Sequence, residues 1–303
     1  MELNQSIELF IKYIKFEKNL TPNTISAYSK DLSLFIEYLV RHNVYETYQI
    51  NLKIFKNFLK FLDKYNYSNN TILRKFSTYI NYFKFLEQNS LISIQLSQYI
   101  SIPKKESRFY NFLTESEMSK LLESIKPEGN FGKRDRAIFE VFYSTGIRIS
   151  ELINITVDNL NLKENEIKIY GKGRKERIVF LDKLAVKCLK DYLEIRNYFL
   201  FDFKKNSYKK SNFLFLNKNG DRISQRYIRV LLKKYLELAG INKQLSPHGL
   251  RHSFASHLLQ EGAGIREVQE LLGHENINTT QIYTHLNIKK IKNDYNKYHP
   301  RAN

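Results

Sequence analysis

The sequence is short of cysteine and of long hydrophobic runs, and these absences exclude several classes of protein. Cys188 is the only cysteine among 303 residues, so no internal disulfide can form, as is usual in a reducing cytoplasm. Lys, Asn and Glu interrupt every apolar run before it reaches the roughly 18 residues of a membrane-spanning helix. The first residues, MELNQSIELF, include neither the basic nor the apolar region of a signal peptide. We therefore expect a cytoplasmic protein with no membrane partner.

Acidic residues are also scarce relative to basic ones. The chain has 49 Lys and Arg against 31 Asp and Glu, a formal net charge of +18. This excess favours a polyanionic partner, most simply a nucleic acid. Plentiful Lys, Asn, Ile, Tyr and Phe are equally compatible with an AT-rich coding bias. The charge alone does not separate DNA from RNA or from an anionic membrane surface.

The length and the helical patterns predict two domains joined by a linker. Residues 1–100 read as four helices near 3–19, 22–39, 50–65 and 69–86, with Pro22 and Ser68 as start signals, and so as a four-helix bundle. Residues 101–112 combine Pro103 with basic side chains, which is typical either of a solvated loop or of a strap along a phosphate backbone.

Residues 113–303 are expected to form a second, mixed α/β domain. Helices are predicted to about 124 from a capping box at Thr114, over 133–145, around the buried Cys188 and over 225–238. A β-hairpin is predicted over 166–181, with Ile167, Ile169, Ile178 and Phe180 alternating with polar residues. Residues 200–212 read as irregular, and a short strand pair with an Asn-Gly turn follows. The fold class is therefore mainly α with a small β-sheet.

The stretch from 246 to 283 contains four polar groups suited to phosphate chemistry, and it reads SPHGLRHSFASHLLQEGAGIREVQELLGHENINTTQIY. His248 and Arg251 share one face of a helix that starts at a Ser-Pro cap. His274 follows a second helix over 265–272, and Tyr283 lies on a third that begins near 278. The HxxxH spacing of His248 and His252 is also found in zinc sites, but Gly249 replaces the glutamate of that pattern.

Two cationic side chains upstream complete the candidate set. Arg148 follows a helix-ending glycine and lies between two aliphatic residues, so we expect it to be buried with an anion. Glu151 and a phosphate are both compatible partners, and Ser150 is a plausible cap for the next helix. Lys172 lies in a G-K-G turn, where it is either solvated or a phosphate ligand, since the spacing is not that of a Walker A loop.

Several of these segments resemble the motifs of one family. HGLRHSFASHLL, LLGH and TTQIYTH are similar to the catalytic motifs of tyrosine recombinases of the phage-integrase family, especially the bacterial XerC/XerD branch. STGIRISEL resembles the first-arginine motif, IYGKGRKERIVFL the hairpin with the catalytic lysine, and TPNTISAYSKDLSLFIEYL the N-terminal domain. The resemblance implies a SAM-like core-binding domain over 1–100, a basic linker over 101–112 and a catalytic domain over 113–303. Together these would form a C-shaped DNA clamp.

The resemblance also implies an activity and a set of catalytic residues. Such enzymes cut and rejoin DNA strands through a 3′-phosphotyrosyl intermediate, without metal, ATP or another cofactor. The catalytic positions would be Arg148, Lys172, His248, Arg251, His274 and the nucleophile Tyr283. The partners would be a double-stranded recombination site, a homo- or hetero-tetramer on two duplexes and a DNA translocase as activator. The C-terminal tail, with Ile288, Ile291, Tyr295 and Tyr298 on its apolar face, would dock into a neighbouring subunit.

Several roles stay open at the level of the sequence. The chain begins directly with the first bundle, which favours chromosome-dimer resolution over a mobile-element integrase or excisionase that carries an arm-binding domain. A topoisomerase-like enzyme and a non-catalytic DNA-binding module are further alternatives. The C-terminal tail disfavours a topoisomerase-like enzyme, and the complete catalytic set disfavours a non-catalytic DNA-binding module. The sequence leaves open an XerC-like, an XerD-like or a single-recombinase role.

Overall fold

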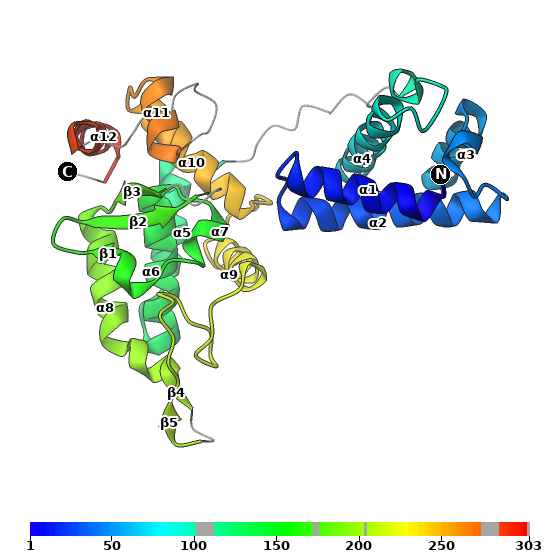
Figure 1. The fold of residues 1–303 in the computed structure, drawn as a ribbon. Helices are drawn as coiled ribbons and strands as arrows, with labels where there is room; N and C mark the ends of the chain where they lie inside the picture. Colours follow the sequence, from blue (N-terminus) through cyan, green and yellow to red (C-terminus); the bar gives the residue numbers. More distant parts are fainter. Residues whose placement is uncertain (101–111, 172–175, 203–204, 274–284, 302–303) are drawn as a thin grey trace. The chain divides into compact units, whose positions relative to one another are not determined.

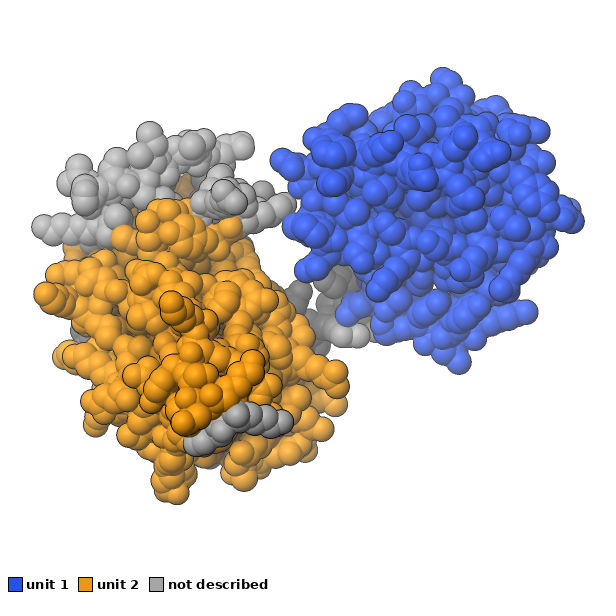
Figure 2. All heavy atoms as spheres, turned by 60° about the horizontal axis from the view of Figure 1, so that its bottom comes forward, with its two compact units in different colours: residues 1–108 blue, residues 109–303 orange. Residues whose placement is uncertain are grey.

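The computed structural model describes residues 1–100, 112–171, 176–202, 205–273 and 285–301, and for 285–289 the backbone only. The chain divides into two compact units, Met1–Arg108 and Phe109–Asn303, each shown in its own colour in Figure 2. No helix among the described residues is long and apolar enough to cross a membrane.

Four long helices build unit 1, as the sequence predicts (Figure 1). They are α1 (Leu3–Phe16), α2 (Pro22–Arg41), α3 (Leu52–Asp63) and α4 (Asn69–Gln88), with 3-10 turns η1 (Thr47–Gln49) and η2 (Leu96–Tyr99). The expected starts are confirmed: Pro22 opens α2 after the N-cap Thr21, and the Ser68 side chain accepts a backbone hydrogen bond at the start of α4. Helix α1 ends three residues earlier than predicted, since Asn19 adopts a left-handed φ of 52°.

An aromatic core holds these helices together. Phe35 of α2 meets Phe58 of α3 and Tyr79 of α4 at centroid distances of 4.7 and 5.6 Å. Beside this core the buried carboxylate of Asp31 accepts hydrogen bonds of 3.0 Å from both Lys75 and Thr78 of α4. A buried carboxylate with these partners ties α2 to α4, and it has no further chemical role among the described contacts.

Unit 2 combines eight described helices with short antiparallel strands (Figure 1). The helices are α5 (Glu115–Ser124), α6 (Gly129–Thr145), α7 (Ile149–Leu152), α8 (Lys183–Leu200), α9 (Gln225–Leu238), α10 (Pro247–Gln260), α11 (Ile265–Leu272) and α12 (His285–Tyr298). A 3-10 turn, η3 (Val157–Asn159), precedes the first strand. The strands are β1 (Leu160–Asn161), β2 (Glu166–Tyr170) and β3 (Glu176–Phe180) in the order β1-β2-β3, and a separate pair, β4 (Phe201–Asp202) and β5 (Ser207–Tyr208).

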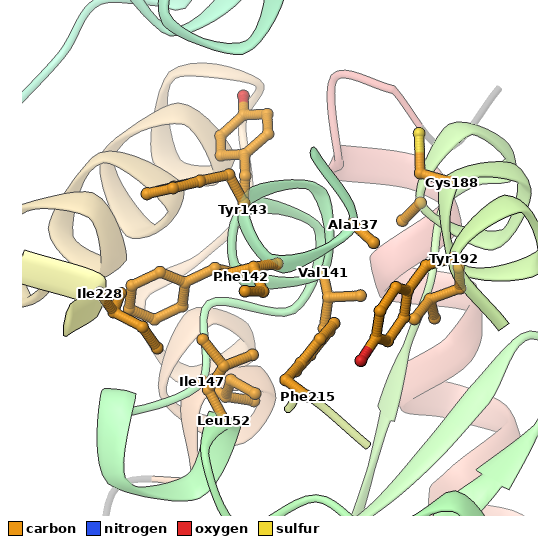
Figure 3. Packing of buried hydrophobic residues seen from close by; sticks show 14 of the residues in the cluster. Ala137, Val141, Phe142, Tyr143, Ile147, Leu152, Cys188, Tyr192, Phe215 and Ile228 are labelled. Carbon is orange, nitrogen blue, oxygen red and sulfur yellow. The ribbon is translucent and has the colours of Figure 1, made fainter. Parts of the chain in front are cut away.

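Helix α6 runs through the main core of unit 2. Its buried side chains point to several sides: Ala137 and Val141 face Tyr192 and Phe215, while Phe142 points toward Ile228 of α9 (Figure 3). All but one of the eleven residues from 135 to 145 are fully or almost fully buried. Cys188 of α8 belongs to the same cluster, which confirms that it is a buried hydrophobic residue.

The predicted β-hairpin forms, but its two faces differ from the prediction. Ile167 and Ile169 of β2 pair with Val179 and Arg177 of β3, so these positions share the core side. Phe180 instead joins a second cluster with residues of α10, α11 and α12. Ile178 and Phe180 therefore lie on the opposite side of the hairpin from Ile167 and Ile169, and β3 has buried residues on both of its sides.

Other elements also depart from the prediction. The expected strand pair after residue 212 is reduced to a single bridge between Leu216 and Arg222, while β4 and β5 occur in the stretch predicted as irregular. Helix α6 starts at Gly129, four residues before the predicted start. Ser150 is not a cap, since Arg148 already occupies that position before α7.

The C-terminal helix α12 packs against its own unit in this single chain. Ile291 and Tyr295 are buried in the second cluster, and the Tyr295 hydroxyl lies 2.8 Å from Ser144 Oγ of α6. Beyond α12, the guanidinium of Arg301 contacts Glu140 and lies 3.1 Å from Asp182. The tail thus closes one side of unit 2 through apolar and ionic contacts.

Candidate active site

The turn between α6 and α7 presents the first candidate, Arg148. Gly146 ends α6 with a left-handed φ of 57°, and a Cβ at this position would collide with the ring of Phe254 in α10. This close approach sets the turn directly beside α10. Arg148 follows two residues later with its side chain 42% exposed, so the expectation that it is buried was wrong.

Glu151 is the anion that Arg148 contacts in the structure. Its Oε1 accepts a hydrogen bond of 3.0 Å from Arg148 Nη1, and its Oε2 accepts one of 2.7 Å from the Arg148 backbone N–H. Both carboxylate oxygens also accept hydrogen bonds from Arg177 of β3, each of 2.8 Å. Burial alone would raise the pKa of Glu151, but the hydrogen bonds and charge of Arg177, followed by those of Arg148, outweigh it and lower this pKa to about 2.

Arg251 is the second cationic candidate and is only 4% exposed. Its Nη1 donates to the carbonyl oxygen of Gly146 at 2.7 Å, and its Nη2 donates to that of Leu272 at 2.8 Å. One guanidinium therefore fixes both the α6–α7 turn and the end of α11. Burial and the nearby charge of Arg148 lower the pKa of Arg251 to about 10, so it remains a cation at neutral pH.

His248 lies one helical turn before Arg251 on α10, and its side chain is exposed. Partial desolvation, and then the positive charges of Arg251, His252 and Arg148, lower its pKa below the ordinary histidine value. The charge of Arg148 acts on both His248 and Arg251, so these three groups lie near one another. Two guanidiniums can bind an anion, and the neutral imidazole beside them can accept a proton from a neighbouring group.

Helix α10 also anchors the start of unit 2. Leu113 donates its backbone N–H to Ser253 Oγ at 2.9 Å and accepts a 2.7 Å hydrogen bond from His257 Nε2. Since Nε2 carries the proton toward a carbonyl, Nδ1 of the neutral ring accepts from the Tyr143 hydroxyl at 2.9 Å. The helix that positions Arg251 therefore also holds the residue that follows the linker region.

Three of the six predicted catalytic residues lie outside the described residues: Lys172, His274 and Tyr283. Their flanks are described. Lys172 falls between β2 and β3, His274 comes directly after the left-handed Gly273 that ends α11, and Tyr283 lies between α11 and α12.

Comparison with known proteins decides the family. Residues 111–290 match the phage integrase family, and residues 7–90 match the N-terminal SAM-like domain of phage integrases. The chain belongs to the phage integrase family. This confirms the predicted membership, and with it the mainly helical fold class that combines a SAM-like domain with a tyrosine-recombinase domain.

Similar proteins within this family are tyrosine recombinases. A tyrosine recombinase XerC of Natranaerobius thermophilus is 42% identical over 97% of this chain and 98% of its own length. A tyrosine recombinase XerD of Oceanobacillus iheyensis is 38% identical over 99% of this chain and the whole of its own. The crystal structure of the XerH site-specific recombinase bound to a palindromic difH substrate, a post-cleavage complex, matches with a TM-score of 0.69 and 26% identity, covering 97% of this chain and 86% of that one.

Membership of the phage integrase family makes this protein a DNA strand-cleaving and rejoining enzyme. The sequence pattern already named Glu151 as one partner for Arg148, and the structure shows that contact. Arg177 was missed. The alternation of Ile178 and Phe180 put it on the polar side of the strand, and only its cross-strand pairing with Ile169 shows that it lies on the core side.

Proposed function

We propose that this phage integrase is a site-specific recombinase whose catalytic residues are Arg148, Lys172, His248, Arg251, His274 and Tyr283. Tyr283 Oη would attack the scissile phosphorus, forming a 3′-phosphotyrosyl bond as the bond from phosphorus to the 5′ oxygen breaks. His248 would take the phenol proton, and Lys172 would give a proton to the leaving 5′ oxygen. Attack by a second strand's 5′-hydroxyl reverses these steps, so no ATP is consumed.

The arrangement of Arg251 is the observation that carries this proposal. The two hydrogen bonds that it makes to described residues go to neutral carbonyl oxygens, so its positive charge is not used up by a carboxylate. The charge of Arg148 acts on the same guanidinium and lowers its pKa. An anion between them would relieve this repulsion, and a phosphate with charge building up on its non-bridging oxygens is such an anion. His274 would add a further hydrogen bond.

We infer the cellular role from the likeness to the named relatives. Recombinases named XerC and XerD match this chain over nearly its full length, which supports a role in resolving chromosome dimers in the cytoplasm. We infer that unit 1 grips the core DNA site, that unit 2 carries the chemistry, and that the two form a clamp around the duplex. Four subunits would assemble on two duplexes with a translocase as activator, and α12 would dock into a neighbour.

A covalent trapping experiment tests the reaction class. The substrate is a duplex bearing the recombination site of the host's replication terminus, nicked so that the cleaved strand diffuses away. Wild type, without metal or ATP, should yield a covalent protein–DNA band on a denaturing gel, and Tyr283→Phe should yield none. Arg148→Ala or Arg251→Ala should bind the duplex but cleave it about 10²–10³ times more slowly. Covalent complex from Tyr283→Phe, or wild-type rates in both arginine variants, would overturn the assignment.

A further inference from the structure

Arg177 occupies an unusual position for a charged side chain. Only 8% of its surface is exposed, and it shares one side of β3 with Val179. A guanidinium is costly to bury unless its hydrogen bonds are satisfied. Here Nη1 and Nη2 each donate to one oxygen of Glu151 at 2.8 Å, a bidentate pair, whereas the buried Nε has no hydrogen-bond partner among the described residues.

The carboxylate of this pair also contacts Arg148. The same two carboxylate oxygens accept from the side chain and the backbone N–H of Arg148. Glu151 is almost fully buried and cannot turn without breaking both contacts with Arg177. Arg177 on β3 therefore fixes the position of the Glu151 carboxylate, and with it the side from which Glu151 holds the half-exposed Arg148 guanidinium.

Arg177 also packs beneath the turn that precedes His274. Gly273 ends α11 with a φ of 66°, and a Cβ added there would lie 2.8 Å from both Cδ and Nε of Arg177. The absence of a side chain at Gly273 lets the backbone rest on the arginine stem. The neighbouring carbonyl of Leu272 is held by Arg251. The backbone leading into His274 is thus held between two arginines.

We propose that Arg177 is a positioning residue that aligns Arg148 on the non-bridging oxygens of the scissile phosphate by holding Glu151, while it also supports the end of α11 at Gly273. It does not touch the DNA itself. The proposal rests on the proposed assignment of Arg148 as a phosphate ligand. The alternative is that Arg177 and Glu151 form an ordinary buried ion pair, which would affect only the stability of unit 2.

The test compares Arg177→Gln and Arg177→Lys with a matched control, Arg196→Gln. Arg196 of α8 is also 8% exposed and donates to the backbone carbonyls of Ser211, Phe213 and Leu214, none of which is a site residue. Single-turnover cleavage of the nicked duplex is measured on three substrates. One has the normal phosphate, one has sulfur in place of the leaving 5′ oxygen, and one has a methylphosphonate, which lacks the negative charge on one non-bridging oxygen.

A positioning role predicts a loss that depends on the substrate. Arg177→Gln should bind the duplex within about threefold of wild type yet cleave the normal phosphate about 10²-fold more slowly, the size of effect expected from a small misplacement. The loss should persist with the sulfur leaving group, because the leaving-group acid is intact. The loss of cleavage rate should be smaller on the methylphosphonate, because less negative charge must be stabilised on the phosphorus group. Arg148→Ala should show the same smaller loss on this substrate. Arg177→Lys keeps the cation but not the bidentate geometry, so it should show the same pattern with a smaller loss.

Other outcomes of these assays would show whether the positioning role of Arg177, the assignment of Arg148 or the proposed function is wrong. The positioning role would be overturned if Arg177→Gln cleaves at the wild-type rate. It would also be overturned if Arg177→Gln, Arg177→Lys and Arg196→Gln all lose the same activity on all three substrates. Either result would leave the proposed function intact. An Arg148→Ala variant without substrate dependence would instead overturn the assignment of Arg148. A wild type that forms no covalent complex on any substrate would overturn the proposed function and this proposal together.

Discussion

At the scale of single residues, the site depends on how charge is placed around one exposed histidine. Partial burial of His248 disfavours its charged form, and the nearby cations Arg251 and Arg148 add to this effect and lower its pKa further. The imidazole is therefore neutral at a lower pH than an ordinary histidine, and a neutral imidazole can accept the proton of a tyrosine. Arg251 keeps its own proton at neutral pH although it is buried.

The titration of His248 in the free protein tests this balance. We expect its pKa, measured by NMR and assigned with His248→Gln, to lie below the ordinary value of about 6.5. Desolvation is the larger cause and the neighbouring cations are the smaller one, so Arg148→Met should raise this pKa without fully restoring it. A pKa above the ordinary value in wild type, or one that falls in Arg148→Met, would contradict the arrangement.

The carboxylate of Glu151 makes stability depend on pH in a defined direction. Its pKa is depressed to about 2 in the folded protein, so its contribution is fully present above its unfolded-state pKa of about 4.3 and is lost as the pH falls toward 2. Glu151→Gln should therefore lower the free energy of unfolding by about 3 kcal/mol at neutral pH and by less at about pH 3.5.

Urea titrations at the two pH values measure this difference. Glu237→Gln is the control, because Glu237 is exposed and pairs with Lys233 at 3.8 Å, a surface contact worth at most about 1 kcal/mol. An equal effect of Glu151→Gln at both pH values would show that the carboxylate is not held ionised by Arg177 and Arg148.

At the scale of elements, α10 organises unit 2 around the site. One face of the helix carries His248 and Arg251, and Ser253 and His257 hold Leu113 at the start of the unit. Its apolar residues Phe254 and Leu258 belong to the cluster that receives α11 and α12. A displacement of α10 would therefore shift Arg251, Leu113 and the residues packed against α12 together.

The contact between α10 and the α6–α7 turn yields a prediction at this scale. Gly146→Ala forces a side chain into a left-handed conformation and against the Phe254 ring, so it should destabilise the protein by about 2–4 kcal/mol. Gly240→Ala is the matched control, with a φ of 68° and open space around the added Cβ, and should cost only about 1 kcal/mol.

Urea unfolding of the two variants gives the comparison, and cleavage assays add a second readout. Because Arg251 donates to the Gly146 carbonyl, Gly146→Ala should also slow cleavage, whereas Gly240→Ala should not. Equal destabilisation by both substitutions would mean that the turn does not press against Phe254.

At the scale of the whole molecule, the net charge of +18 governs how the protein meets DNA. Helix α9 exposes four basic side chains along its length: Arg226, Arg229, Lys233 and Lys234. Cations on a regular helix can neutralise successive phosphates and release their counterions. We therefore expect the logarithm of the DNA association constant to fall steeply and linearly with the logarithm of salt concentration.

The slope of that line identifies contributing residues. Arg229→Ala should make it shallower by about one unit if the α9 face contacts phosphates. Lys190→Ala of α8 is the charge-matched control, because Lys190 is exposed on a helix that carries no site residue, and it should leave the slope unchanged. Fluorescence anisotropy over a salt series measures both. Equal changes in the two variants would assign the effect to net charge and not to α9.

Local signals in the sequence determined most of the helices and part of the site. A Ser-Pro start fixes where α10 begins, a left-handed glycine fixes where α11 ends, and helical spacing puts His248 and Arg251 on one face. Each of these depends on residues within about one turn of each other, so the short-range pattern carries the information. The family motifs identified the same residues and the fold class.

Only the tertiary structure decided what these residues contact. Arg251 reaches a carbonyl 105 positions away, and Arg177 reaches a carboxylate 26 positions away. The residues around Arg148 left open whether Glu151 or a phosphate is its partner, and the alternation of Ile178 and Phe180 did not show that they lie on the opposite side of the hairpin from Ile167 and Ile169. Such contacts depend on which elements pack together and on whether a strand is buried on one side or both. That outcome is set by the whole core and is not encoded in any short stretch of the chain.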